Sequence, residues 1–544
     1  MSKKNLLKIF SLMLVMFILV AAFAGCTQKG SSNEDSKTQT TTGSSDSQSE
    51  ETSDSTSEAL VSDKKITLKI MAQRDAMGGP WENLRIFKDL EEMTNIHFEF
   101  DVVYEGYDEK KNLALATGDL PDIFLGGLSV DDEETYGPQG LLIDLTDLIE
   151  KYGTNIKATF EKYPTLKRSV TSSDGKIYAL GQILKTPTMG SYKPVINATW
   201  LKNLNLSVPE TTEELYNVLK AFKTQDPNQN GQADEIPLGE YQFDNLNGML
   251  LPAFGSMAQD IWVKDGKVTF TPMTDAYKHY LEYLNRLYKE ELIDPMFISQ
   301  SIDEFLAKTK LNVYGVLGAV RQSDWTQFQM LSPLTSQYNS EKFSSSTDRL
   351  YSTGRFAITK ANKYPVESIK WADLFFTELD DGIDGITGAA LWIGRRGVDW
   401  DFTEDKSAVK YLFTPEEGQT EIQYLLQKVT PSQTGFVGQL ILEVPFESPY
   451  LRWVGENNTK YVFPYLRNDW IYPSGARFTK EEHEKLSILK TDIGNYVQQE
   501  RAKFVTGDNS FDKWGEYIQT LKNMKIDEYI QIYQDAYDRF MKNN

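Results

Sequence analysis

The chain has 544 residues, a formal net charge of -21 and one cysteine. This strong negative charge argues against binding to nucleic acid and against lying flat on an anionic membrane, and a single cysteine excludes a disulfide within the chain. The length exceeds what one hydrophobic core usually supports, so we expect two or more domains.

The first 25 residues have the pattern of an export signal. Three lysines precede an apolar run over residues 9–24, and the segment ends in Ala24-Gly25-Cys26. The run is shorter than the roughly 20 residues of a membrane span, which favours a signal peptide over 1–25. The ending resembles the lipobox of bacterial lipoproteins. The resemblance implies cleavage before Cys26, a lipid such as palmitate on that residue, and attachment to the extracellular face of the cell membrane. The alternatives are an ordinary secretory signal or a membrane-spanning helix.

A polar segment follows the cysteine. Half of the residues over 27–62 are Ser or Thr, and large apolar side chains occur only at its end. Such a composition cannot bury enough surface to offset the entropy of ordering the chain. We therefore predict a lipidated cysteine and flexible tether over 26–64, with the folded body starting at 65.

The beginning of the body alternates between strand and helix patterns. Strands are predicted over 66–71, 97–104 and 122–125, with helices over 81–92 and 108–116 between them. This order predicts an α/β fold with a parallel sheet covered by helices on both faces. In open sheets of this kind, ligands bind past the carboxyl ends of the strands.

Three later segments also have helical patterns. Residues 210–223 begin with a capping pair, Thr211 and Glu214, and carry one apolar face. Residues 371–379 form part of a second helix. An apolar stripe over 526–540 predicts a third, and we interpret its stripe as a packing surface.

Four stretches carry a family resemblance. They are TGDLPDI over 117–123, GKIYAL over 175–180, the segment 199–222 and the segment 226–238. Together, in this order, they resemble extracellular solute-binding proteins of carbohydrate ABC transporters. The nearest group is the large lipoproteins similar to alginate- and oligosaccharide-binding proteins.

The resemblance implies a periplasmic-binding-protein-like fold with two α/β lobes, a hinge between them and sugar in the cleft. By analogy, residues 65–187 and 350–430 form lobe one. Residues 188–349 and 431–544 form lobe two. It also implies that the chain acts as a monomer that delivers its ligand to ABC transporter permease subunits.

The loop over 226–235 has the spacing of a calcium site. Oxygen-bearing side chains occupy the first, third, fifth and ninth positions, and a glycine occupies the sixth, as in an EF-hand. The twelfth position is Pro237 instead of the usual Glu, so Asp234 or Glu235 would have to complete the shell. The alternative is an ordinary Asx-rich surface turn. The candidate ligands are Asp226, Asn228, Asn230, Gln232, Asp234 and Glu235. The family resemblance also implies a structural calcium ion here.

The segment WIGRRGVDW over 392–400 is the first candidate for sugar binding, because aromatic faces stack on sugar rings. Trp392 and Trp400 would supply such faces, and Trp400 matches an aromatic that contacts sugar in some relatives. Arg396 stands where those relatives have Glu, and Arg395 is a second cation. The pair suggests an acidic sugar such as a uronate, held bidentately. The alternative is a surface turn whose arginines pair with acidic residues of the protein.

Three further residues are candidates for the cleft. Arg321 and Trp325 follow a strand-like run over 313–320, and Trp81 lies in the loop after the first predicted strand. Packing in the core is an equal alternative for both tryptophans.

The sequence contains no motif for catalysis. His483-Glu484 begins like a zinc-protease motif, but Ser487 stands where the second histidine is needed. We therefore expect a membrane-tethered binding protein that captures an oligosaccharide, and not an enzyme. The alternatives are a glycan-degrading surface lipoprotein, or a peptide-binding or sensor protein with the same fold.

Overall fold

The computed structural model describes residues 60–320, 325–346, 350–431 and 437–542. The predicted signal peptide, Cys26, nearly all of the predicted tether and Arg321 lie outside these ranges. Within the described residues, no helix combines the length and the apolar character that crossing a membrane requires. The body begins slightly before the expected residue 65, because the Leu60 N–H donates to Met93 O (2.9 Å) and Val61 is buried in the core.

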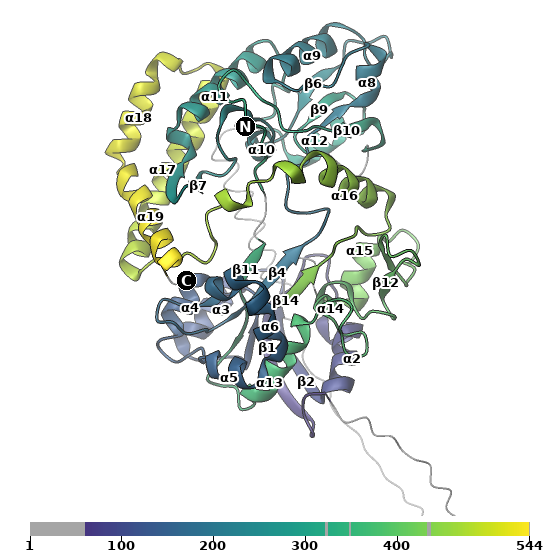
Figure 1. The fold of residues 1–544 in the computed structure, drawn as a ribbon, viewed down its shortest axis with the longest axis vertical. Helices are drawn as coiled ribbons and strands as arrows, with labels where there is room; N and C mark the ends of the chain where they lie inside the picture. Colours follow the sequence, from purple (N-terminus) through teal and green to yellow (C-terminus); the bar gives the residue numbers. More distant parts are fainter. Residues whose placement is uncertain (1–59, 321–324, 347–349, 432–436, 543–544) are drawn as a thin grey trace, which may run out of the picture. The chain divides into compact units, whose positions relative to one another are not determined.

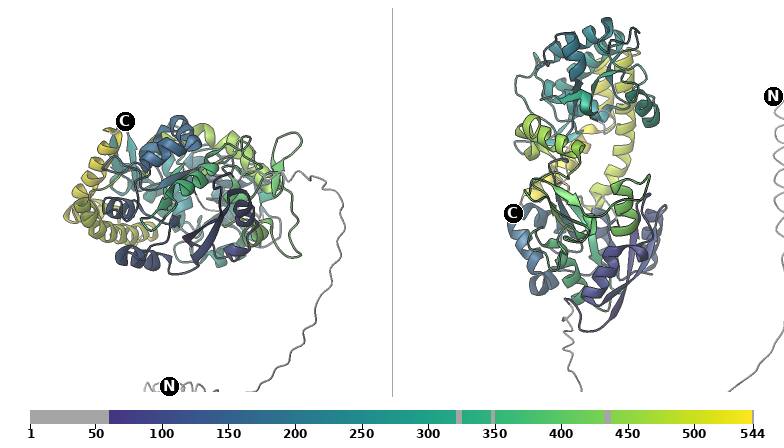
Figure 2. Two further views of the ribbon diagram at one scale, coloured as in Figure 1. Left: turned by 90° about the horizontal axis from the view of Figure 1, so that it is seen from below. Right: turned by 90° about the vertical axis from the view of Figure 1, so that its right-hand side faces the viewer.

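Six strands form the larger sheet, in the order β14-β4-β11-β3-β1-β2. All of them run parallel except β11, which is antiparallel to both β3 and β4. The predicted order of strand, helix, strand, helix, strand is confirmed, as is the parallel pairing. The strands are β1 (Ile66–Gln73), β2 (Ile96–Val103), β3 (Ile123–Leu125), β4 (Leu180–Lys185), β11 (Tyr351–Ile358) and β14 (Gly438–Ile441). Figure 2 shows β1 and β2, in purple, at one edge of this sheet.

Helices pack against this sheet and bury an aromatic core (Figure 1). Trp371 contacts Phe98 and Phe375 edge-on, with ring centroids 5.1 and 4.7 Å apart. Such pairs stabilise a core beyond the area that they bury. The helices of this part are α2 (Arg85–Thr94), α3 (Tyr107–Thr117), α4 (Val130–Tyr136), α5 (Thr146–Tyr152), α6 (Thr154–Lys162), α7 (Pro164–Val170), α13 (Pro365–Asp373), α14 (Ala390–Ile393) and α15 (Glu421–Tyr424). A short ribbon of β12 (Trp400–Phe402) and β13 (Val409–Tyr411) follows α14.

The second sheet has four strands in the order β10-β5-β9-β6. Only β6 and β9 pair in parallel. Its strands are β5 (Val195–Asn197), β6 (Ile236–Gly239), β9 (Tyr314–Leu317) and β10 (Phe328–Met330), and a separate hairpin joins β7 (Ile261–Lys264) to β8 (Lys267–Phe270). Its helices are α8 (Ala198–Asn203), α9 (Thr212–Thr224), α10 (Phe243–Phe254), α11 (Asp275–Lys289), α12 (Ile302–Thr309) and α16 (Pro449–Tyr461). The predicted helix over 210–223 is confirmed as α9, and Thr211 accepts a bond from the Glu214 N–H (3.1 Å).

Three C-terminal helices complete the core of this second part. They are α17 (Lys480–Thr506), α18 (Trp514–Asn523) and α19 (Ile526–Lys542), and α17 runs along α11 (Figure 1). Ile526, Tyr529 and Ile532 of α19 are buried in the same hydrophobic cluster as α9, α10 and α11. The C-terminal apolar stripe is therefore a packing surface.

Three connections join the two sheets. Their described residues are 186–194, 331–346 with 350, and 442–448, so each sheet is assembled from segments that are far apart in the chain. The expected boundary after residue 430 lies too early, because β14 pairs with β4 and keeps the chain in the larger sheet through Ile441.

A buried ion pair fixes the chain before α17 to helix α4. Arg477 Nη2 lies 2.7 Å from Glu133 Oε2, and Nη1 lies 3.0 Å from Glu134 Oε1. Arg477 also donates to the carbonyl oxygen of Ser169 in α7 (3.2 Å). Complete burial raises the pKa of Glu133 to about 7 despite the neighbouring guanidinium.

We predict that Arg477→Met lowers the free energy of unfolding by about 3–5 kcal/mol, since it leaves Glu133 buried without its partner. Lys485→Met is the matched control, because it removes an exposed ion pair to Glu528 (3.0 Å) and should cost less than about 1 kcal/mol. Urea denaturation of both variants measures the difference. Equal losses would show that the buried pair does not hold these segments together.

Glu133 should also make stability depend on pH. Between its ordinary pKa of 4.5 and about 7, the unfolded chain loses this proton while the folded chain retains it. The free energy of unfolding therefore falls as pH rises through this window, by up to about 3 kcal/mol from this group. Glu133→Gln removes the titration, so the difference between wild type and variant should change between pH 4.5 and 7. A constant difference would contradict the raised pKa.

Candidate functional site

A cavity of about 780 Å³ lies at the carboxyl edge of the larger sheet. This volume is within the usual range of pockets for small molecules, about 300–1,000 Å³. The described residues that line it include Lys185, Thr186, Pro187, Met189, Gly190, Ser346, Leu350, Tyr351, Leu442 and Glu443, together with Thr165 and residues within 459–474. All three connections between the sheets, or the residues next to them, therefore reach one cavity.

Strand register explains why these remote segments meet. Lys185, at the end of β4, pairs with Ile441, at the end of β14, so the residues that follow both strands leave the sheet side by side. Tyr351 begins the antiparallel strand β11 opposite Ile183 and so lies at the same edge. The cavity is thus past the carboxyl ends of parallel strands, as expected for open sheets, but at β4 and β14 and not at β1 and β3.

Three aromatic side chains line the cavity, Tyr351, Phe463 and Tyr472. Tyr472 is held in place: its hydroxyl donates to Tyr533 O (2.8 Å), and the two rings meet edge-on with centroids 5.2 Å apart. Burial raises the pKa of Tyr472 well above its usual value, so its hydroxyl stays protonated at neutral pH. A fixed aromatic ring on a cavity wall is suited to stacking on a sugar ring.

The polar groups of the lining are mostly hydroxyls and one amide. They come from Thr165, Thr186, Ser346, Thr459, Asn468 and Ser474. The charged residues are Lys185, Glu443 and Asp469, and Lys185 Nζ lies 3.5 Å from Glu443 Oε1. Several polar groups that converge on an aromatic, apolar wall are typical of a site for a polyhydroxylated ligand.

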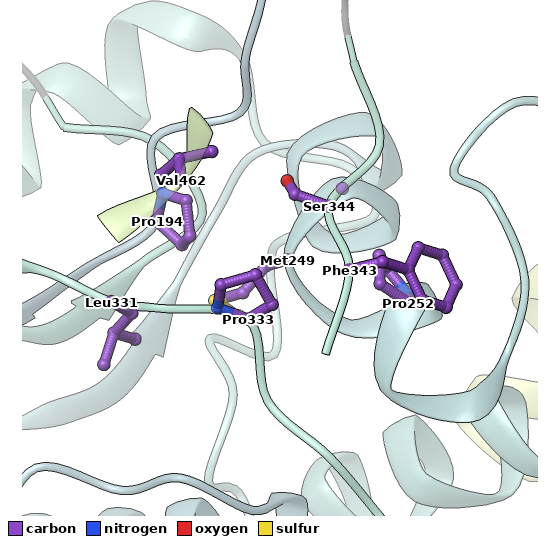
Figure 3. Close-up of a pocket in the computed structure, with 9 residues that line it drawn as sticks. Pro194, Met249, Pro252, Leu331, Pro333, Phe343, Ser344 and Val462 are labelled. Carbon is purple, nitrogen blue, oxygen red and sulfur yellow. The ribbon is translucent and has the colours of Figure 1, made fainter. Parts of the chain in front are cut away.

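A second cavity is too small for such a ligand. Its volume is about 10 Å³, which is room for one water molecule at most. Met249 and Pro252 of α10 meet Pro194, Pro333 and Phe343 of the connections there (Figure 3). We interpret it as a packing defect where two connections cross α10.

The tryptophans of the segment 392–400 are in the core. Trp400 is 0% exposed and Trp392 is 6% exposed, and the Trp400 indole N–H donates to Gly394 O (2.9 Å). Trp81 is likewise buried, 1% exposed, and packs against Phe87 with centroids 5.4 Å apart. These three rings have no open face for a sugar in this structure, and none of them lines the large cavity.

Both arginines of this segment bind groups of the protein itself. Arg396 lies 2.7 Å from Asp380 and 3.1 Å from Asp401. Arg395 donates to Asp384 O (2.6 Å). Neither lines the cavity. The geometry therefore corresponds to the alternative interpretation, in which acidic residues of the protein neutralise the arginines.

Trp325 has a different environment. It is partly exposed and packs against Trp453 and Tyr450 of α16, with ring centroids 5.6 and 6.4 Å apart. It does not line the cavity, and Arg321 lies outside the described residues. A role of Trp325 in ligand binding stays a prediction.

The sequence analysis missed the residues that line the cavity. Tyr351, Phe463 and Tyr472 belong to no motif. Tyr351 is placed by the pairing of β11 with β4, whereas Phe463 and Tyr472 belong to the segment after α16, which is held by the bridge from Leu466 to Ser344 and by the contact of Tyr472 with Tyr533. The one local signal is the segment Tyr472-Pro473-Ser474-Gly475, an irregular aromatic connection before a long helix.

The predicted calcium loop connects α9 to β6, and its side chains converge. Asp226 accepts bonds from the N–H groups of Asn230 (3.1 Å) and Gly231 (2.9 Å). The side-chain amides of Asn228 and Asn230 both donate to Asp234 (3.1 Å). Gly231 has a positive φ of 75°, which a glycine adopts without strain.

The loop also contains a carboxylate with one oxygen that has no hydrogen-bond partner. Glu235 Oε1 is buried without a hydrogen-bond partner, and its pKa is raised by burial and by the charges of Asp234 and Asp226. Within the described ranges, no group of three or more His, Cys, Asp and Glu side chains has the arrangement of a metal site. The loop instead brings together three carboxylates, Asp226, Asp234 and Glu235, and the side-chain amides of Asn228 and Asn230. Carboxylate and amide oxygens are the donor types that suit a hard cation.

No protein-family model matches the chain. FusA, a fructooligosaccharide ABC transporter substrate-binding protein of Streptococcus pneumoniae, is 28% identical over 506 residues, covering 88% of this chain and 91% of FusA. The polygalacturonan/rhamnogalacturonan-binding protein YtcQ of Bacillus subtilis is 24% identical, covering 87% and 92%. Lipoprotein LipO of the same organism is 29% identical over 44% of this chain and 47% of LipO.

The structure of FusA in complex with kestose matches with a TM-score of 0.69 and 25% identity, over 88% of this chain and all of that chain. The chain has the fold of an ABC transporter substrate-binding protein. A further structure of FusA, 26% identical and with the same TM-score, is of an EF-hand mutant. FusA and YtcQ are named as binding proteins and not as enzymes, which favours binding over the glycan-degrading alternative.

Proposed function

We propose that this protein is the substrate-binding protein of an oligosaccharide ABC transporter and that the 780 Å³ cavity holds the sugar. The observation that carries the proposal is the convergence of the inter-sheet connections on a cavity with aromatic and hydroxyl groups. The similarity to FusA and YtcQ over most of the chain supports the same role.

In the proposed mechanism, the two sheets, each with its own helices, move as separate bodies. Each has its own hydrophobic cluster, and three connections link them, so bending within the connections changes the cavity while both cores stay intact. A sugar that contacts Lys185 and Tyr351 on one side and Asn468 on the other favours the arrangement in which these groups are closest. Ligand binding then shifts the population towards a closed form that the permease subunits recognise.

The proposal places the protein outside the cell, anchored through lipidated Cys26 and a tether. The support is the signal pattern of the first 26 residues and the partial similarity to a protein named as a lipoprotein. The Ser- and Thr-rich composition of residues 27–62 suits a spacer between the membrane and the folded body.

A calcium ion in the loop 226–235 is a second part of the proposal. Asp226, Asn228, Asn230, Asp234 and Glu235 would hold it through side-chain oxygens, and Gln232 through its backbone carbonyl. The convergence of these side chains, the poorly satisfied Glu235 and the EF-hand named for FusA support it. The ion would brace the turn between α9 and β6 and would take no part in chemistry.

We predict that Tyr472→Ala weakens sugar binding by about tenfold or more, because it removes the ring fixed against Tyr533. Tyr472→Phe is the matched variant, since it keeps the ring and loses only the bond to Tyr533 O. Calorimetric titration with kestose and other oligosaccharides measures the affinity. If only Trp325→Ala weakens binding, the sugar site lies at Trp325 and not in the cavity.

Calcium should stabilise the wild-type protein. Metal that binds only the folded state at a hundredfold excess over its dissociation constant adds about 2.7 kcal/mol, and chelator should reverse this gain. The variant with both Asp226→Ala and Asp234→Ala should show no response to calcium in thermal denaturation. If wild type and variant respond equally to calcium, the ion binds elsewhere. If the wild-type protein shows no response and holds no bound metal, the proposed calcium site is wrong.

A further inference from the structure

We infer that the cavity selects uncharged oligosaccharides and that Glu443 and Asp469 exclude sugars carrying carboxylates. The inference rests on the proposed function and adds the class of ligand. The names of the relatives leave this open, because fructooligosaccharides are neutral whereas polygalacturonan is polyanionic.

The charges of the lining are unfavourable for an anion. Lys185 is the lining's only cation among the described residues, and Glu443 at 3.5 Å neutralises it. Asp469 is exposed and forms no ion pair within the described part of the chain, so the lining keeps one net negative charge.

The cavity also lacks the residue that usually recognises a carboxylate. An arginine binds a carboxylate with two parallel hydrogen bonds, and no described lining residue is an arginine. Arg395 and Arg396, which suggested a uronate, are bound to the protein's own acidic and carbonyl groups. Arg467, between the lining residues Leu466 and Asn468, pairs with Glu341.

A neutral sugar is not repelled by the carboxylates of the lining and needs no arginine as a partner. The hydroxyls of a sugar donate to carboxylates such as Asp469, and charge-assisted hydrogen bonds of this kind are stronger than neutral ones. The hydroxyl and amide groups of Thr186, Thr459 and Asn468 match further sugar hydroxyls. The formal net charge of -21 for the chain adds a long-range repulsion against anionic ligands.

The test compares charged and uncharged forms of the same sugars. The wild-type protein is titrated with oligogalacturonides as free acids and as methyl esters, and with kestose and galacto-oligosaccharides, at low and high salt. We expect a neutral ligand to bind and every free acid to bind at least tenfold more weakly than its neutral counterpart. The difference should shrink at high salt, since screening weakens charge repulsion but not steric exclusion.

Variants assign the effect to the two carboxylates. The double variant Asp469→Asn with Glu443→Gln leaves Lys185 as the only charged group among the described lining residues, so free acids should gain affinity at least tenfold. Glu447→Gln is the matched control, because Glu447 lies near β14 but does not line the cavity. Thermal denaturation of each variant confirms that it folds.

The outcomes separate the inference from the proposed function. If a free acid binds wild type as tightly as its neutral form, the inference is wrong and the proposed function stands. If the double variant gains no affinity for acids, Glu443 and Asp469 are not the cause. If no sugar of either kind binds the folded protein, the proposed function is wrong.

Discussion

The pairing of β4 with β11 and β14 is the constraint on which the site depends. β4 is separated from each of the other two strands by more than a hundred residues of sequence, yet two ladders of hydrogen bonds fix the register. Because β4 and β14 are parallel and end together, their following residues must leave the sheet at one edge. The lining residues at the ends of β4, β11 and β14 follow from that register and not from any local motif, and the segment after α16 supplies the others.

Ion pairs also join separate segments of the protein. Two arginines illustrate internal neutralisation: Arg477 pairs with Glu133 and Glu134, and Arg396 pairs with Asp380 and Asp401. In an acidic chain of this kind, arginines can form internal ion pairs that connect separate segments. A buried pair such as Arg477 with Glu133 then ties distant segments together, although its desolvation makes it a weak source of net stability.

Local sequence patterns were sufficient to predict the first three strands and one later helix. Alternation and capping residues identified β1, β2, β3 and α9 because each depends on its own sequence. Family resemblance supplied the fold as a whole. The cavity could not be predicted, since Tyr351, Phe463 and Tyr472 meet only through long-range contacts: strand pairing for Tyr351 and packing on Tyr533 for Tyr472. Trp400 illustrates the opposite error: a tryptophan in a glycine-rich turn looks exposed, but here it closes a small core beside β13.

The chain enters the body at the edge of the larger sheet opposite to the cavity. Leu60 bonds to Met93 and β1 begins at Ile66, at the amino ends of the parallel strands, whereas the cavity lies past their carboxyl ends. The chain is held at this point by the backbone bonds of Leu60 and Ser62 and by the pairing of β1 with both β2 and β3. The entry of the chain and the cavity therefore lie at opposite ends of the parallel strands, and the described residues on either side of β1 do not line the cavity.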